Sequence, residues 1–193
     1  MPAELTEKAR LRALMRARLR DAPPRDSAML CRKLAELDAL ARTDCLVAFL
    51  AFQHEPQTDS FLENWLANHK RLILPRFHHE SRNYELVEVT NLTSQTTPGF
   101  YGIREPKSQL VAIQALSENC AWLVPGLAFT TSGSRLGRGA GYYDRLFTKF
   151  PQGKRIGIAW EMQLLPEIPI DPWDVRMDFV VTEARTLECA SST

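Results

Sequence analysis

Short apolar segments alternate along the chain with segments whose apolar residues recur at helical spacing. The most apolar of them, CLVAFLAF at 45–52, is hydrophobic throughout, which is typical of a strand covered by helices on both faces. Strands that alternate with helices predict an α/β fold, a three-layer arrangement with a mainly parallel sheet flanked by helices. The segments expected to form strands are 45–52, 71–77, 84–89, 120–126, 154–160 and 178–183.

An amphipathic helix is predicted at 5–20, where it would form a basic N-terminal arm. Lys8, Arg12 and Arg16 are spaced four apart, so they share one face of this helix. The apolar stripe on another face would consist of Leu11, Leu14, Met15 and Leu19. The chain of 193 residues shows no repeat and no convincing linker, so we expect residues 1–193 to form a single domain.

The charge balance bears on the class of partner. The chain carries 24 basic and 23 acidic residues, for a formal net charge of +1. A nucleic-acid-binding protein usually has a strong basic excess, which this chain has only in its N-terminal arm. Binding of nucleic acid through that arm stays a disfavoured alternative, and we expect a small-molecule substrate instead.

The cysteines and the apolar runs indicate where the protein works. None of the four cysteines forms a Cys-x-x-Cys pair, so a zinc site and a disulfide framework are disfavoured and reduced thiols are expected. The start of the chain lacks the apolar segment of a signal peptide, and the longest apolar run is far shorter than the roughly 20 residues that span a bilayer. We therefore expect a cytoplasmic protein that has no membrane partner. A monomer is a separate expectation, which these features do not decide.

The glycine-rich segment SRLGRGAGYYDRLF at 134–147 is the strongest indication of chemistry. Alternating glycines let the backbone approach an oxyanion closely, and successive N–H groups then form an anion-binding nest. The helix expected to follow adds its positive N-terminal end, and Arg135 and Arg138 suit phosphate oxygens. Asp144 follows the loop and is a natural ligand for Mg²⁺ beside a phosphate.

Two familiar nucleotide motifs fit this segment poorly. A P-loop requires Gly-x-x-x-x-Gly-Lys-Ser/Thr, which is absent. The dinucleotide fingerprint follows its strand directly, whereas about ten residues separate the strand 120–126 from these glycines. A flexible turn with solvated arginines remains the alternative without function.

The segment VPGLAFTTSGSRLGRGAGYYDRLF resembles the signature of the 5-formyltetrahydrofolate cyclo-ligase family, also called methenyltetrahydrofolate synthetase. That signature runs Pro-Gly, a loop, then Arg-Leu-Gly-Tyr/Arg-Gly-x-Gly-Tyr-Tyr-Asp. One departure is Ala140, where the family usually has Gly or Lys, and we expect it to tune affinity rather than abolish activity. The ATP-binding residues that the resemblance implies are Lys8, Arg12, Arg135, Leu136, Gly137, Arg138, Gly139, Ala140, Gly141, Tyr142 and Tyr143.

Other segments extend the resemblance over nearly the whole chain, with 107–118 its weakest part. VAFLAFQHEPQT at 47–58 and FYGIREP at 100–106 resemble folate-contacting segments, and IPIDPWDVRMDFVVTE at 168–183 resembles the family's closing acidic stretch. The metal-binding residues implied for Mg²⁺ are Asp144 and Asp174. The substrate-binding residues implied for the folate are Leu50, Glu55, Tyr101, Arg138 and Tyr142, with Phe100 as an alternative to Tyr101 for stacking on the pterin and His54 expected to be a bystander.

The family resemblance implies an ATP- and Mg²⁺-dependent cyclisation of 5-formyltetrahydrofolate to 5,10-methenyltetrahydrofolate, with release of ADP and phosphate. The formyl oxygen would attack the γ-phosphate, and N10 would then displace phosphate from the formyl carbon. Two alternatives remain open at this stage. One is an ATP-dependent enzyme that acts on another pterin or amide, and the other is a non-catalytic folate- or nucleotide-binding module.

Overall fold

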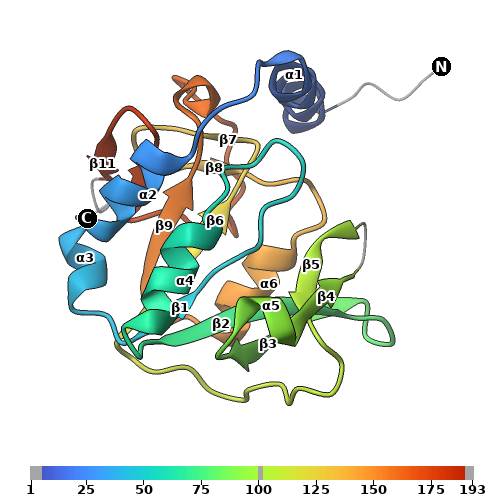
Figure 1. Cartoon of the computed structure of the whole chain (residues 1–193). Coiled ribbons are helices and arrows are strands. Elements are labelled where there is room, and N and C mark those ends of the chain that lie inside the picture. The colour runs from blue at the N-terminus through green and yellow to red at the C-terminus, as the bar shows by residue number, and fades with distance from the viewer. Residues whose placement is uncertain (1–5, 100–101, 190–193) are drawn as a thin grey trace.

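A mixed seven-stranded sheet forms the centre of the computed structural model, which describes residues 6–99 and 102–189 (Figure 1). The strand order is β11-β10-β9-β6-β1-β2-β3. The five central strands run parallel, and β3 and β11 pair antiparallel at the two edges. The strands are β1 Cys45–Val47, β2 Arg71–His78, β3 Asn83–Val89, β6 Cys120–Pro125, β9 Lys154–Ile158, β10 Phe179–Val181 and β11 Thr186–Glu188. This arrangement confirms the predicted fold class.

The first strand is shorter than its apolar run predicts. β1 ends at Val47, although residues 48–50 are as buried as the strand itself. In the strand, Cys45 pairs with Arg71 of β2 and with Cys120 of β6. Beyond Val47 the chain leaves the sheet, so Phe49 and Leu50 lie at the carboxyl ends of the parallel strands, where α/β folds form their ligand sites.

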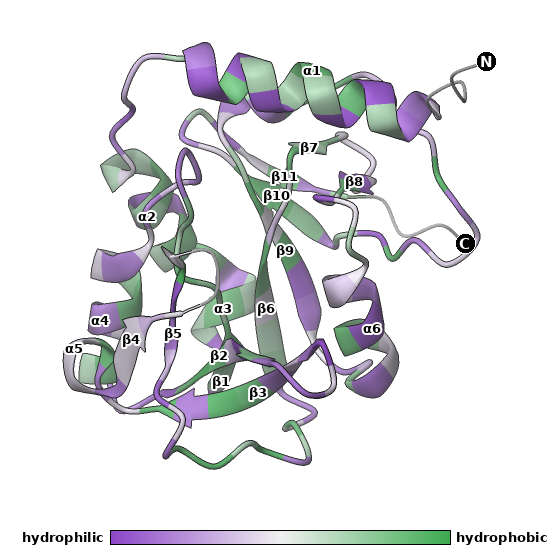
Figure 2. Cartoon of the chain, turned by 90° about the vertical axis from the view of Figure 1, so that its right-hand side faces the viewer, coloured by the Kyte–Doolittle hydropathy of each residue, from purple (hydrophilic) through white to green (hydrophobic). Residues whose placement is uncertain are grey.

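Two layers of helices cover the sheet, as the nearly continuous apolar strands require. The helices α2 Ala28–Ala35, α3 Asp38–Ala41 and α4 Asp59–Ala67 pack on one face, and α6 Tyr142–Lys149 packs on the other (Figure 2). Alternate residues of β1 pack against the helices on opposite faces of the sheet. Leu46 belongs to the cluster under α2 and α4, whereas Cys45 and Val47 belong to the cluster under α6.

The N-terminal helix α1, Glu7–Asp21, lies across the carboxyl ends of the strands (Figures 1 and 2). Met15 and Leu19 are buried in a third apolar cluster together with Trp160, which follows β9. The expectation that Leu14 belongs to the buried stripe is wrong, because its side chain is 61% exposed. The stripe that packs is narrower because α1 contacts the rest of the chain along one side only.

Smaller elements complete the structure. Short antiparallel pairs join β4 to β5 and β7 to β8. Their bounds are β4 Thr96–Pro98, β5 Arg104–Pro106, β7 Ala128–Phe129 and β8 Arg135–Leu136, and the remaining helices are α5 Leu92–Gln95 and the 3₁₀ turn η2 Glu161–Gln163. In the part of the chain that the structure describes, no helix has the length and apolar character to cross a membrane.

Candidate active site

A pocket of about 360 Å³ lies at the carboxyl ends of the parallel strands, and Lys8 and Arg12 of α1 line it. Segments from across the sequence form its wall: α1, the chain after β1, the strands β2 and β3, the glycine-rich loop and the loop at 171–174. The lining residues that carry charge are Lys8, Arg12, Glu55, Arg135, Arg138, Asp144, Asp171 and Asp174. The remaining lining residues are mostly apolar or glycine, so the pocket offers complementary surfaces to charged groups and to a flat apolar ring.

The glycine-rich loop runs from β8 to the first turn of α6. Gly139 has φ 109° and Gly141 has φ 66°, a region of backbone conformation that residues with a side chain rarely adopt. Gly141 is also the residue that precedes α6, so the loop delivers its N–H groups to the positive end of that helix. The geometry is that of a site for an anion such as a phosphate.

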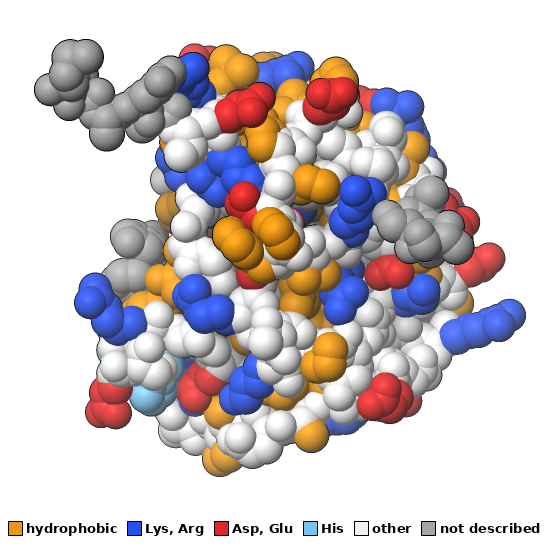
Figure 3. All heavy atoms as spheres, turned by 180° about the vertical axis from the view of Figure 1, so that it is seen from behind, with side chains coloured by type: hydrophobic (Ala, Val, Ile, Leu, Met, Phe, Trp, Pro, Cys, Tyr) orange, Lys and Arg blue, Asp and Glu red, His pale blue; other side chains and the backbone are white. Residues whose placement is uncertain are grey.

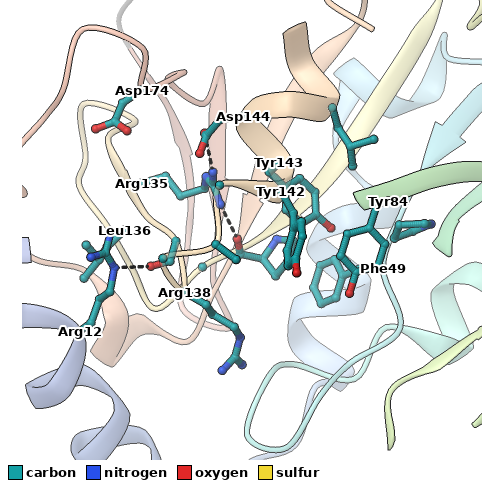
Figure 4. A pocket seen from close by; sticks show the side chains of 18 of the residues that line it. Arg12, Phe49, Tyr84, Arg135, Leu136, Arg138, Tyr142, Tyr143, Asp144 and Asp174 are labelled. Atoms are coloured by element: carbon teal, nitrogen blue, oxygen red, sulfur yellow. Dashed lines mark hydrogen bonds and ion pairs between the residues drawn. The ribbon is translucent and has the colours of Figure 1, made fainter. Parts of the chain in front are cut away.

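Helix α1 holds this loop through two arginines. Arg12 donates from Nε to the carbonyl oxygen of Gly137 at 3.0 Å (Figure 4). Arg16 donates to the carbonyl oxygen of Arg138 at 2.9 Å. These bonds leave other guanidinium N–H groups of Arg12 to face the pocket that it lines. The predicted basic face of the helix therefore contacts the loop directly.

Lys8 forms ion pairs with two carboxylates of the loop at 171–174. Its Nζ donates to Asp171 at 2.6 Å and also to Asp174. Partial burial of Lys8 opposes its charge, but the hydrogen bonds to Asp171 and Asp174 outweigh that effect and raise the pKa of the ammonium. Lys8 is therefore cationic at neutral pH and joins the N-terminal helix to a segment near the end of the chain.

Arg135 and Asp144 form a second ion pair within the pocket. Arg135 donates to the Asp144 carboxylate at 2.9 Å, and its side chain is only 8% exposed. The Nε–H of Arg135 is buried and has no hydrogen-bond partner among the described residues. Beneath this pair, burial raises the pKa of the Tyr143 hydroxyl, so Tyr143 stays protonated. Arg135 therefore lines the pocket with a guanidinium that Asp144 holds in place.

Glu55 lies under Arg138 and is almost fully buried. Arg138 donates to one Glu55 carboxylate oxygen at 2.7 Å, and the backbone N–H of Phe52 donates to the other at 2.9 Å. The side chain of Glu55 is 8% exposed, and the Arg138 guanidinium also lies over the Phe52 ring at 5.2 Å. Glu55 is consequently an acceptor held in a fixed position at the wall of the pocket.

Aromatic side chains gather at the end of the pocket away from Arg12 and Asp174 (Figure 4). Tyr84 packs edge-on against Tyr142 at 4.8 Å between ring centroids, and Phe77 packs edge-on against both rings. Phe49 lies beside them. These rings form a wall that suits a flat heterocycle.

The structure brings the predicted site residues together with one exception. Every residue expected to bind ATP, the metal or the folate lines the pocket, apart from Tyr101, which together with Phe100 lies outside the described residues. His54 does not line this pocket. The sequence interpretation missed several lining residues: Phe49, Phe52, Pro75, Tyr84, Ile103, Pro125, Gly126, Leu146, Asp171 and Trp173. Tyr84 carried no signal beyond its place in the predicted half-exposed strand 84–89, where it resembles an ordinary packing residue.

Comparison with known proteins gives one consistent result. Residues 3–183 match the model of the 5-formyltetrahydrofolate cyclo-ligase family. A probable 5-formyltetrahydrofolate cyclo-ligase of Caenorhabditis elegans is 31% identical and covers 93% of this chain and 94% of its own. The 5-formyltetrahydrofolate cyclo-ligase of Mycolicibacterium smegmatis is 32% identical over 79% of each chain. The solution structure of Aquifex aeolicus 5,10-methenyltetrahydrofolate synthetase superposes with a TM-score of 0.82 at 26% identity, covering 97% of this chain and 95% of that one.

Proposed function

The chain belongs to the 5-formyltetrahydrofolate cyclo-ligase family, and on this premise we propose that its pocket holds ATP and the folate side by side. The chain is an enzyme that converts 5-formyltetrahydrofolate to 5,10-methenyltetrahydrofolate with consumption of ATP. Family membership selects this reaction among the activities that the sequence leaves open. The observation that supports the proposed placement is the position of the glycine-rich loop, between a cationic wall and an aromatic wall of one pocket.

ATP is proposed to lie with its phosphates on the glycine-rich loop. Arg12, Arg135 and Lys8 supply positive charge on one side, and the backbone N–H groups of residues 137–141 supply donors on the other. The helix terminus alone contributes only about 0.3–1 kcal/mol at an exposed site, so most of the neutralisation falls to the cations.

The folate is proposed to lie at the aromatic end, with its pterin against Tyr142 and the chain at Leu50. The carboxylate of Glu55 would accept hydrogen bonds from the amino and ring N–H groups of the pterin. Its present partners, Arg138 and the Phe52 N–H, hold the carboxylate in place. Such a fixed acceptor selects for a heterocycle that has N–H donors on one edge.

Magnesium is proposed to bind between Asp144, Asp174 and the phosphates. The described residues contain no cluster of three or more His, Cys, Asp or Glu side chains that would hold a metal by itself. That finding fits Mg²⁺, which commonly uses one or two carboxylates and completes its shell with phosphate oxygens and water. When bound, Mg²⁺ neutralises charge that develops on the phosphates. In this structure Arg135 forms an ion pair with Asp144, and Lys8 forms one with Asp174. If Mg²⁺ bound these two carboxylates, both cations would turn toward phosphate oxygens.

The protein contributes positioning rather than a covalent nucleophile. The formyl oxygen forms a bond to the γ-phosphorus as the bond to ADP breaks. N10 then bonds to the formyl carbon, phosphate leaves with the former formyl oxygen, and N10 gives up its proton. An amide oxygen is a weak nucleophile, so the γ-phosphate must be held in line and its charge stabilised. Arg138 lies at the boundary between the two walls, where this transfer would occur.

The setting of the enzyme is part of the same proposal. All four cysteines are free thiols in the structure, as expected of a protein from a reducing compartment. We infer a cytoplasmic monomer in which residues 1–193 act as a single cyclo-ligase-like domain. Sedimentation at micromolar concentration would test the monomer, since a dimer would sediment at twice the 21.9 kDa mass.

A direct assay tests the function. Purified protein is mixed with 5-formyltetrahydrofolate and Mg-ATP, and formation of the methenyl product is followed by its near-ultraviolet absorbance. We expect product in the complete mixture, none without ATP, and severe loss in Asp144→Asn. Product formed without ATP would contradict the reaction, and full activity of Asp144→Asn would contradict the metal assignment alone.

A further inference from the structure

The chemistry fixes the direction in which ATP lies in the pocket. The γ-phosphate must meet the formyl group, which lies with the pterin at the aromatic end. The adenosine must therefore extend from the glycine-rich loop toward the opposite end. Figure 4 shows Arg12 and Asp174 at that end, on the far side of the loop from Phe49 and Tyr84.

One aromatic side chain stands at this opposite end. Trp173 lines the pocket, directly precedes Asp174 in the sequence and is 69% exposed. The other aromatic residues that line the pocket among the described residues lie in the chain after β1, in β3 or in α6: Phe49, Phe52, Tyr84, Tyr142 and Tyr143. On the face shown in Figure 3, hydrophobic side chains are interspersed with charged ones. Of the large hydrophobic side chains that are exposed among the described residues, Trp173 alone lines the pocket.

The position of Trp173 is fixed through its neighbour. Asp174 accepts from Lys8 and also from the backbone N–H of Asp171 at 2.8 Å, which closes a tight turn around residues 172–173. Lys8 also forms an ion pair with Asp171, so this one residue of α1 holds both ends of the turn. The turn thus presents the indole at the mouth of the pocket and leaves its ring open.

We propose that Trp173 is the stacking platform for the adenine of ATP, an inference that rests on the proposed function of the pocket. An indole offers a broad flat surface, and every purine has a π-face that stacks on it. Stacking discriminates poorly among bases, so GTP and ITP should be accepted nearly as well as ATP. The phosphates would be recognised separately, by the loop and the cations.

The expected effect is a selective loss of nucleotide affinity. A stacked base contributes about 1–3 kcal/mol by alanine substitution, and a partly open platform falls at the lower end of that range. Trp173→Ala should therefore raise the Kd for Mg-ATP by about five- to tenfold. Trp173→Phe, which keeps a smaller ring, should restore part of the affinity. Inorganic tripolyphosphate has no base, so its binding should be equal in all variants.

Two measurements separate stacking from a structural role. Calorimetry gives the affinities of Mg-ATP and Mg-tripolyphosphate for wild type, Trp173→Ala, Trp173→Phe and Ile170→Ala. Ile170 is the matched control, because it is 56% exposed and close by in the chain but does not line the pocket. Acrylamide quenching gives a spectroscopic signature, since Trp65, Trp122 and Trp160 are buried and Trp173 alone of the four tryptophans is exposed. ATP should protect the exposed indole, and tripolyphosphate should not.

Each other outcome would overturn the inference. Equal binding of ATP by wild type and Trp173→Ala would show that the indole contacts no base. Equal weakening of ATP and tripolyphosphate would show that Trp173 acts through the turn and Asp174 instead. Failure of the proposed function would look different: wild type would bind ATP as predicted here but would form no methenyl product, or would bind neither ligand.

Discussion

Arg138 donates to Glu55 at 2.7 Å and so joins the glycine-rich loop to the chain that leaves β1. One residue of this pair belongs to the proposed phosphate site and the other to the proposed pterin site. The pair is enclosed on the Glu55 side, where the carboxylate is 8% exposed, and open on the Arg138 side, where the guanidinium is 40% exposed. The two substrates therefore meet at a junction that already exists in the protein.

Replacing Glu55 by Gln should weaken folate binding more than ATP binding. The amide keeps the size of the side chain but loses the charge that accepts from Arg138 and from the pterin. A hydrogen bond to a charged group contributes about 1.5–3 kcal/mol, so the KM for 5-formyltetrahydrofolate should rise by about 10- to 150-fold. Steady-state kinetics with each substrate varied in turn checks this. His54→Ala, next to Glu55 in the sequence, should change that KM by less than twofold, and an equal rise in both variants would count against the assignment.

Asp174 and Asp171 provide a matched pair for the metal proposal. Both accept from Lys8, but only Asp174 matches the carboxylate that the family resemblance assigns to Mg²⁺. Asp174→Asn should lower kcat/KM by about 100-fold or more, because a metal stabilises charge worth several kcal/mol in the transition state. Asp171→Asn removes only one partner of Lys8, and its 44% exposed carboxylate should cost less than about fivefold. Titrating Mg²⁺ in each variant separates the cases, and identical losses would show that the Lys8 ion pairs matter rather than the metal.

Ala140 offers a gain-of-affinity test. It lies exposed between Gly139 and Gly141, and it is absent from the residues with positive φ, so a longer side chain fits its backbone. Ala140→Lys adds a cation beside the phosphates and should lower the KM for ATP by about two- to fivefold, the scale of an exposed ion pair. Ala140→Gln has a similar reach without the charge and should match wild type. The gain should shrink as salt is raised, and a gain that is independent of salt would argue for a packing effect.

Thiol reactivity should single out Cys31. Burial raises the pKa of Cys45 to about 12 and those of Cys120 and Cys189 to about 11, so these thiols stay protonated and unreactive at pH 8. Cys31 is only partly buried. Brief treatment with iodoacetamide at pH 8, followed by intact mass and peptide mapping, should find label on Cys31 first. Reactivity of the other three should appear as pH rises toward their pKa values or when the protein is unfolded. In Cys31→Ser, rapid labelling of the folded protein would contradict this account.

The sheet was the most predictable part of the fold. Apolar runs such as 71–77 and 120–126 lie within or close to the bounds of β2 and β6, because a strand buried on both faces leaves little choice of residue. The predicted bounds of elements were wrong where a residue is buried without pairing in the sheet, or is apolar without being buried. Residues 48–50 are as buried as β1 but have left the sheet, and Leu14 repeats at helical spacing on an exposed side of α1. Whether a residue pairs in a sheet or is buried depends on which segments of the chain pack beside it, and local sequence patterns do not reveal those tertiary contacts.

The charged half of the site was predictable and the aromatic half was not. A short segment that combines glycines, arginines and an aspartate is not typical of a packed core, and this combination indicates a phosphate-binding loop. Tyr84 and Phe49, by contrast, resemble ordinary core residues, and only the convergence of β3 with the chain after β1 makes them a wall. The Glu55–Arg138 pair spans 83 residues of sequence, a separation at which no local rule connects two side chains.

The ion pairs of Lys8 have a consequence for synthesis on the ribosome. Lys8 and Asp174 are 166 residues apart, so the proposed nucleotide site draws on two parts of the chain that are made at very different times. A nascent chain that has emerged only as far as α6 has its glycine-rich loop but lacks the turn that carries Asp174. We expect such a polypeptide to retain ATP poorly, and a messenger truncated before codon 168 should yield a protein that folds much of its sheet yet consumes no ATP. Catalytic competence would then appear only once the turn that carries Asp174 has been made and has met α1.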